Sequence, residues 1–282
     1  MELTGDALAD IAEPIEELSG SFASVPVIDF GFFSITQYTF WLIIIMALVL
    51  IVVLAAAKRV KLKPEGRFVG MVEYGYDAVR RNMGEGAIGH GFEKHMPFLA
   101  SLFFFILIAN VVGLIPGAKT PTGSLSITWA LAIASFVYFN YWGIKAKGGL
   151  GYLKSIAPSG LPKVMVPIIW FFELISLILR ALTLAVRLYG NMFAGHMILG
   201  IFAILTQVFI AEVAVAGAGF LAGLPAIAWF LFLVVMYALE CLVAFLQAYV
   251  FTILSAVYVG LATSDHQYLG YSAWKKPRLV HI

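Results

Sequence analysis

One tract of the sequence, residues 164–264, holds only five formal charges in 101 residues. These charges belong to Glu173, Arg180, Arg187, Glu212 and Glu240. Over the whole chain 62% of residues are apolar and 12% are charged, whereas an ordinary soluble domain carries about 25% charged residues. This composition predicts an integral membrane protein and argues against a soluble enzyme or a disordered segment. A net charge of +2 also gives no reason to expect a nucleic-acid partner.

Three further stretches are long enough to cross a bilayer, which takes about 20 apolar residues in a helix. They cover residues 35–57, 96–118 and 120–144, and none of them contains a formal charge. Lys119 lies between the second and the third. A Gly/Pro break at residues 217–225 divides the long tract in two. Because strand-like alternation is absent, we predict an all-α membrane protein with five or six membrane helices.

The charges of the loops predict how the chain is oriented. Residues 1–34 contain seven acidic residues and no Lys or Arg, whereas residues 58–95 contain eight basic residues. The positive-inside rule then places the N-terminus outside and the C-terminus inside, which fits five crossings. The expected division is an acidic external arm at 1–34, a first span at 35–57, an inner loop at 58–95, a helical hairpin at 96–144, a basic inner loop at 145–163, the long tract at 164–264 and a cytoplasmic tail at 265–282.

The inner loop at 58–95 contains an apolar pattern of helical spacing. Its members are Phe68, Met71, Val72, Gly75 and Val79, with charged residues between them. This pattern predicts an amphipathic helix on the inner membrane surface. An ordinary helix in a cytoplasmic loop fits the same pattern, so the sequence leaves both interpretations open.

The two halves of the long tract are too long for simple spans. Residues 164–216 number 53 and residues 226–264 number 39. A 39-residue helix is about 58 Å long, whereas the hydrocarbon core is about 30 Å thick. Each half therefore either breaks into a hairpin or lies strongly tilted, because common tilts of about 20° do not absorb such a mismatch. A strong tilt would call for a protein partner along one side of the helices.

Polar residues line one narrow face of the first half, at spacings of 3, 4, 3, 4 and 4. They are Glu173, Ser176, Arg180, Thr183, Arg187 and Asn191. A charged group inside a bilayer costs about 2.5 kcal/mol or more, so this face is expected to meet protein or water. The simpler alternative is a structural ion pair between Glu173 and a neighbouring arginine.

A second set of polar residues lies away from this stripe. His196 follows Arg187 by nine residues, which places it on the opposite side of the same helix and assigns it to a different site. The second half carries a sparser polar line made of Tyr237, Glu240, Gln247 and Tyr258. A His and a Glu that are each isolated in apolar helices suggest a pair across helices or a water path.

The nine residues 187–195, Arg-Leu-Tyr-Gly-Asn-Met-Phe-Ala-Gly, resemble the signature of subunit a of F-type ATP synthases. Gln247-Ala248-Tyr249 resembles a step of that family's last helix, and Asn110 with Leu114-Ile115-Pro116 resembles the end of its second span. The resemblance implies a non-catalytic subunit that translocates protons. It also implies that the two long helices lie tilted against a ring of c subunits, with subunit b of the peripheral stalk as a further partner.

The resemblance assigns roles residue by residue. Arg187 matches the family's essential arginine, and Gln247 matches the glutamine that faces it. Asn191, His196 and Glu240 match residues of the outer half-channel, and Glu173 matches a carboxylate of the inner one. His196 and Glu240 stand exchanged relative to many bacterial members, as in mitochondrial-type members, and Gly113 stands where some relatives carry an acid. Glu212 and Gln207 match no motif and are assigned to the outer entrance only by their place toward the outer end.

Two other classes of protein remain as alternatives at this stage. A proton-coupled secondary transporter or antiporter would also use intramembrane Arg, Glu and His, although such proteins usually show internal repeats that are absent here. A structural subunit of a respiratory complex is the second alternative. No phosphate loop, metal-ligand cluster or nucleophile triad is visible, so no cofactor, metal or nucleic acid is expected. We expect a bacterial inner membrane, with an organelle inner membrane as the alternative.

Overall fold

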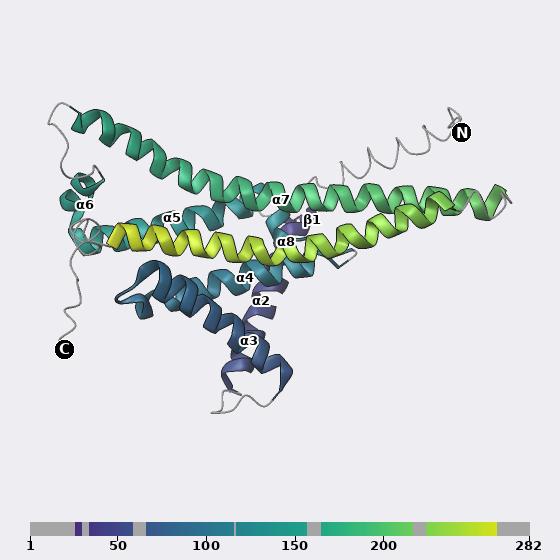
Figure 1. Cartoon of the computed structure of the whole chain (residues 1–282), viewed down its shortest axis with the longest axis horizontal. Helices are drawn as coiled ribbons and strands as arrows, with labels where there is room; N and C mark the ends of the chain where they lie inside the picture. The colour runs from purple at the N-terminus through teal and green to yellow at the C-terminus, as the bar shows by residue number, and fades with distance from the viewer. Residues whose placement is uncertain are drawn as a thin grey trace, which may run out of the picture. The chain divides into compact units, whose positions relative to one another are not determined.

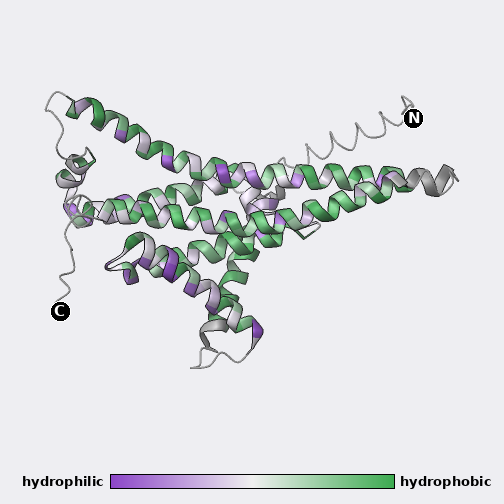
Figure 2. Cartoon of the chain, viewed as in Figure 1, coloured by the Kyte–Doolittle hydropathy of each residue, from purple (hydrophilic) through white to green (hydrophobic). Residues whose placement is uncertain are grey.

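The computed structural model describes residues 26–29, 34–58, 66–115, 117–156, 165–216 and 224–263. In this part of the chain five helices are long and apolar enough to cross a membrane. They are α2 (Gln37–Lys58), α4 (Met96–Gly113), α5 (Leu125–Lys147), α7 (Val166–Ala216) and α8 (Leu224–Thr263). Figure 2 shows them apolar along most of their length. The predicted all-α membrane fold is confirmed, with five long helices among the described residues.

Shorter elements lie between these helices. They are the strands β1 (Pro26–Asp29) and β2 (Ser34–Thr36), the helix α3 (Arg67–Ala78), the π-helix η1 (Val79–Ile88), the 3-10 helices η2 (Phe92–Lys94) and η3 (Pro121–Gly123), and the helix α6 (Gly149–Ser155). The two strands pair antiparallel, with Asp29 opposite Ser34. The sequence did not predict this strand pair, because strands of four and three residues are too short to show a pattern.

The turn between α4 and α5 is longer than the sequence predicted. Helix α4 ends at Gly113 and α5 begins at Leu125, whereas the apolar stretches suggested a break only at Lys119. Thr120 is buried, and its hydroxyl donates a hydrogen bond to the carbonyl of Ala109 at 3.1 Å. A side chain at position 113 would overlap Thr120, so Gly113 lets the loop fold back onto the end of α4.

Helices α7 and α8 are the longest elements in Figure 1, with 51 and 40 residues. At 1.5 Å per residue they are about 76 Å and 60 Å long. Helix α7 is continuous, so residues 166–190 form no surface hairpin, and one of the two explanations for its length is removed. The strong tilt that remains as the explanation stays a prediction.

The chain divides into two compact units. The first combines described residues up to Glu73 with Ser101–Thr128 and Val186–Phe251. In this unit α7 and α8 lie side by side, as Figure 1 shows, and the ring of Phe202 lies 5.8 Å from Trp229 and 6.1 Å from Phe232 between centroids. Ala244 and Ala248 are fully buried, which allows close packing along this face of α8.

The second unit combines Tyr74–Ala100, Trp129–Ala185 and the described residues from Thr252 on. Its core is a buried cluster of Phe139, Tyr152, Leu177, Val259 and Ala262. The Ser135 hydroxyl donates a hydrogen bond to the Ser255 hydroxyl at 2.8 Å, which joins α5 to α8. Buried polar bonds of this kind fix the contact between two otherwise apolar helices.

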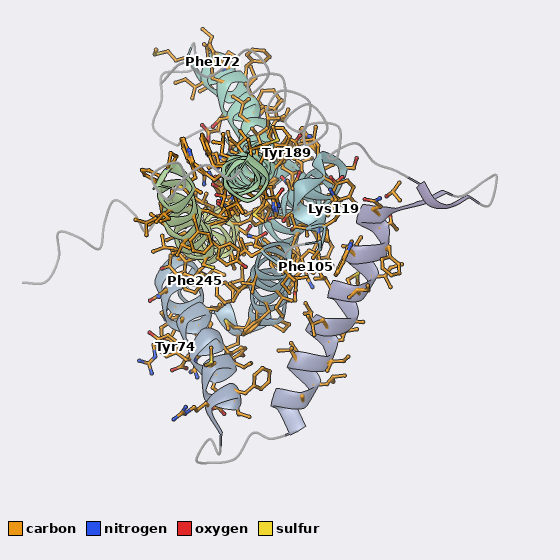
Figure 3. The ribbon with its side chains drawn as sticks, turned by 90° about the vertical axis from the view of Figure 1, so that its right-hand side faces the viewer. Tyr74, Phe105, Lys119, Phe172, Tyr189 and Phe245 are labelled. Atoms are coloured by element: carbon orange, nitrogen blue, oxygen red, sulfur yellow. The ribbon has the colours of Figure 1, made fainter. Side chains whose placement is uncertain are left out.

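Residues predicted to form an amphipathic helix do form a helix, α3, which continues into η1. Phe68, Met71 and Tyr74 are exposed along one side, and Figure 3 shows Tyr74 directed outward. Val69 and Val79 are buried. The location of this helix on the inner membrane surface stays a prediction.

The residue just before α4, His95, is buried in the second unit. Its Nδ1 atom lies 3.1 Å from the Tyr138 hydroxyl, and its ring lies 4.8 Å from the ring of Trp142. Burial lowers the pKa of His95 below its ordinary value, and the neighbouring Lys94 cation lowers this pKa further. Burial therefore favours the neutral form of His95, whose ring contacts Tyr138 and Trp142 just before α4.

Candidate functional site

Four buried side-chain atoms of the first unit have no hydrogen-bond partner among the described residues. They are Nδ2 of Asn191, Nε2 of His196, Oε1 of Glu240 and Nε2 of Gln247. Buried polar atoms in proteins are bonded in about 90% of cases, so a group of exceptions needs an explanation. All four residues were singled out from the sequence as parts of a proton path. Polar atoms that protein groups leave open inside an apolar bundle are suited to bind water or to pass protons.

The carboxylate of Glu240 lies directly against the backbone of α7. Glu240 is only 8% exposed, and a side chain added at Gly195 would overlap both of its carboxylate oxygens. The glycine therefore allows a carboxylate from α8 to reach α7 at the residue next to His196. The sequence showed Gly195 only as the last residue of a motif and gave no sign that it provides space for Glu240.

Arg187 lies on α7 in the first unit, with an exposed side chain. Within the part of the chain that the structure describes, its guanidinium forms neither an ion pair nor a hydrogen bond. Leu184 and Leu188 on either side of it are buried, so the helix is anchored by leucines while the arginine points away. An exposed arginine in an apolar helix presents a permanent positive charge to whatever covers this face.

Gln247 is expected to face Arg187, and no hydrogen bond joins the two side chains among the described residues. Gln247 is 7% exposed on α8, one turn beyond the buried Ala244. Tyr237, also predicted to lie on the path, donates its hydroxyl to the Leu114 carbonyl at 2.8 Å. That hydroxyl is therefore engaged in a contact with the end of α4.

In the second unit Glu173 and Arg180 form an ion pair, with Oε1 and Nη2 3.0 Å apart. The Arg180 guanidinium also lies 5.4 Å from the centroid of the Tyr258 ring, a distance at which cation–π attraction operates. Thr183 donates its hydroxyl to the Arg180 carbonyl at 3.0 Å. The ion pair that the sequence suggested as an alternative explanation of this stripe is therefore present.

The same ion pair lines a cavity of about 160 Å³ in the second unit. Its lining comes from α5, α6, α7 and α8, and includes Phe139, Lys147, Tyr152, Ser155, Glu173, Arg180 and Tyr258. The Tyr152 hydroxyl donates to Oδ1 of Asn140 at 2.8 Å. Burial raises the pKa of Tyr152, and the charge of Arg180 partly offsets that rise. A cavity of this size with charged and hydroxyl groups on its wall can hold water.

The remaining predicted residues lie as follows. Ser176 is half-buried on α7 and Gln207 is exposed on the same helix. Glu212 lies on α7, and its side chain is outside the described part of the structure. Among the residues that the structure describes, no group of three or more His, Cys, Asp or Glu side chains could hold a metal ion.

Residues 39–260 match the family model described as ATP synthase A chain. The chain belongs to this family. The match covers both units and includes α7 and α8 up to Gly260, so every predicted site residue lies within it. Membership in this family decides against the two alternatives that the sequence left open, a secondary transporter and a structural subunit of a respiratory complex.

Relatives in three bacteria agree with the family. The chain is 41% identical to ATP synthase subunit a of a Nocardioides species, over 75% of each chain. It is 35% identical to ATP synthase subunit a of Chloroherpeton thalassium, over 86% of this chain and 72% of the relative. It is 38% identical to ATP synthase subunit a of Brucella canis, over 68% of this chain and 74% of the relative.

The family gives the protein its role. It has the role of subunit a in the proton-translocating membrane sector of ATP synthase and is not the catalytic part of the complex. It works with the other subunits of that complex. The five apolar helices and the bacterial relatives make it an integral protein of the bacterial inner membrane.

Proposed function

We propose that this subunit a moves protons through two offset half-channels and that Arg187 separates them. The outer half-channel is formed by Asn191, His196 and Glu240, and Gln247 lies on the path as the glutamine that faces Arg187. The observation that carries this assignment is that these four residues supply the buried side-chain polar atoms that have no hydrogen-bond partner among the described residues.

The outer half-channel has the chemistry of a proton relay. A histidine has an ordinary pKa of about 6.5 and exchanges protons readily near neutral pH. The Glu240 carboxylate, which lies beside the backbone next to His196, offers a second exchangeable position. Protons from outside would pass these groups and neutralise a carboxylate on a c subunit of the ring. In this proposal the N-terminus of subunit a lies outside and its C-terminus lies in the cytoplasm.

Arg187 acts as an electrostatic gate. A carboxylate enters lipid only when it is protonated, because desolvation disfavours its charged form. Near a fixed guanidinium the charged form is favoured, so the carboxylate releases its proton there. The arginine itself keeps its proton, so it separates the half-channels without carrying protons across. Its exposed position on α7 supports contact with the c-ring, which would also explain a strong tilt of α7 and α8.

The inner half-channel would use the cavity of the second unit. Glu173 and Arg180 line this cavity together with the Tyr152 and Ser155 hydroxyls. A deprotonated Glu173 can accept the released proton and pass it to water in the cavity. The basic loops on the cytoplasmic side and subunit b of the peripheral stalk are the other proposed neighbours of this half-channel. Each proton that crosses the membrane releases about 2.3 kcal/mol of free energy per 100 mV of membrane potential.

The outer path is tested by Glu240→Gln in reconstituted ATP synthase. This change keeps the shape of the side chain and removes its exchangeable carboxylate, so proton uptake should slow by about tenfold or more. Proton uptake would be followed with a pH-sensitive dye in proteoliposomes driven by a membrane potential. Glu93→Gln, an exposed position in the 3-10 helix η2 of the second unit, is the matched control. Uptake that keeps its rate and its pH dependence in Glu240→Gln would remove Glu240 from the path.

The inner site is tested by exchanging its charges. Glu173→Gln should slow ATP-driven pumping several-fold, roughly two- to tenfold, because the acceptor is lost and Arg180 is left uncompensated. The exchanged pair, Glu173→Arg with Arg180→Glu, restores an ion pair but moves the carboxylate two turns along α7. We expect the exchange to restore assembly of the complex, measured by native gel, and not to restore pumping. Recovery of both would show that the ion pair is only structural.

A further inference from the structure

We propose that Asn110 and Tyr237 are positioning residues that hold α8 in the register at which Glu240 meets α7. This inference rests on the proposed function of Glu240. It comes from two hydrogen bonds that join α4 and its following loop to α8 within the first unit. The two bonds reach α8 on either side of Glu240, at positions 237 and 244.

The first bond starts from a fully buried amide. Asn110 is 0% exposed, and its Nδ2 donates to the Ala244 carbonyl at 3.3 Å. Its Oδ1 accepts a hydrogen bond from the Thr122 hydroxyl at 2.8 Å, and Thr122 in turn lies 2.7 Å from the Thr120 hydroxyl. The amide is thus fixed in orientation by the loop after α4. Because this hydrogen bond is made to a backbone carbonyl of α8, it forms only at one rotation of α8 about its axis and one position along that axis.

The second bond comes from α8 itself. The Tyr237 hydroxyl donates to the Leu114 carbonyl at 2.8 Å. Leu114 directly follows the last residue of α4, where carbonyl groups lack helical partners. The bond therefore serves the end of α4 and fixes the position of α8 at the same time.

The two bonds and the two path residues lie on one face of α8. Tyr237, Glu240, Ala244 and Gln247 follow at spacings of 3, 4 and 3, which is the repeat of a single helical face. A slip of one residue would shift α8 by about 1.5 Å and turn it by about 100°. Such a slip would break both bonds and would take the Glu240 carboxylate away from Gly195. Since α8 is otherwise mostly apolar, these polar contacts supply the directional information that apolar packing lacks.

The test compares single variants in the complete reconstituted ATP synthase. Tyr237→Phe removes only one hydroxyl, and Thr122→Val removes the bond that orients Asn110. Tyr249→Phe removes a hydroxyl from the same helix whose loss breaks no hydrogen bond among the described residues, so it is the matched control. Glu240→Gln is included as the reference for the path itself. Proton uptake is measured per assembled complex, together with its pH profile.

We expect Tyr237→Phe and Thr122→Val each to lower proton uptake per assembled complex by roughly fivefold. This is the change in population that follows the loss of one hydrogen bond. Their pH profiles should shift, since Glu240 and its neighbours change surroundings, whereas Tyr249→Phe should match the wild type. If Tyr237→Phe and Thr122→Val keep the wild-type rate and pH profile while Glu240→Gln is slow, Asn110 and Tyr237 are not positioning residues. The proposed function would still stand in that case. If Glu240→Gln is also unaffected, the proposed function fails instead. If Thr122→Val does not assemble, Tyr237→Phe decides the matter alone.

Discussion

Replacing Arg187 by alanine is expected to abolish proton-driven ATP synthesis and to open a passive proton leak. The side chain is exposed on α7 and has no ion-pair partner among the described residues, so its charge is free to act on a neighbouring subunit. Without it, a ring carboxylate that approaches this face has no fixed cation to favour its charged form. The carboxylate would keep its proton, and nothing would separate the outer path from the inner one.

The experiment measures ATP synthesis and passive proton flux in the same proteoliposomes. Val186→Ala is the matched control, because it is the adjacent residue, is 50% exposed and carries no charge. We expect synthesis below detection in Arg187→Ala and a normal rate in Val186→Ala. Ordinary proton-driven synthesis in Arg187→Ala would show that the gate is elsewhere.

Adding one methyl group at Gly195 is expected to have the second-largest effect. In Gly195→Ala the new Cβ would occupy the space of the Glu240 carboxylate oxygens, so α7 and α8 must separate or the carboxylate must move. Overpacking of this kind costs about 1–3 kcal/mol, and we expect proton uptake to fall by about tenfold or more. Gly70→Ala is the matched control, since a Cβ at that helical glycine meets nothing within 4 Å.

A second change on α8 separates overlap from a general loss of stability. Glu240→Asp shortens the side chain by one methylene and keeps the carboxylate, so it makes room for a methyl group at position 195. The double variant Gly195→Ala with Glu240→Asp should therefore carry protons faster than Gly195→Ala alone. The measurement is the same dye assay, normalised to assembled complex. A double variant that is no faster than Gly195→Ala would contradict a direct contact between these two positions.

The positions of the site residues along the helices could be predicted from the sequence. A rotation of 100° per residue places His196 on the side of α7 opposite Arg187, and the structure has Arg187 exposed and His196 half-buried. The contacts between helices could not be predicted in this way. Nothing in the spacing indicated that Glu240 would rest on Gly195, or that Asn110 would bind the Ala244 carbonyl, because each contact depends on the relative register of two helices.

The stripe on α7 shows both outcomes in one set of residues. Periodicity correctly placed Glu173 and Arg180 on one face, but it left open whether they form an ion pair or line a path. The structure shows an ion pair at 3.0 Å that also lines a cavity, so the two interpretations are not exclusive. The length of the first half of the long tract left a hairpin and a tilted helix open. The continuous α7 excludes a hairpin within Val166–Ala216, and the tilt stays a prediction.

The sequence by itself determined that this protein has membrane helices, which residues are polar within them and, through residues 187–195, which family they resemble. These features are local, because a helix in lipid satisfies its backbone within its own segment and needs no distant partner. Only the tertiary structure decided which buried polar atoms remain open and how α4, α7 and α8 meet around Glu240. Those features depend on close approach at Gly195 and on two hydrogen bonds between segments more than a hundred residues apart. A sequence pattern of period 3.6 carries no information about such distances.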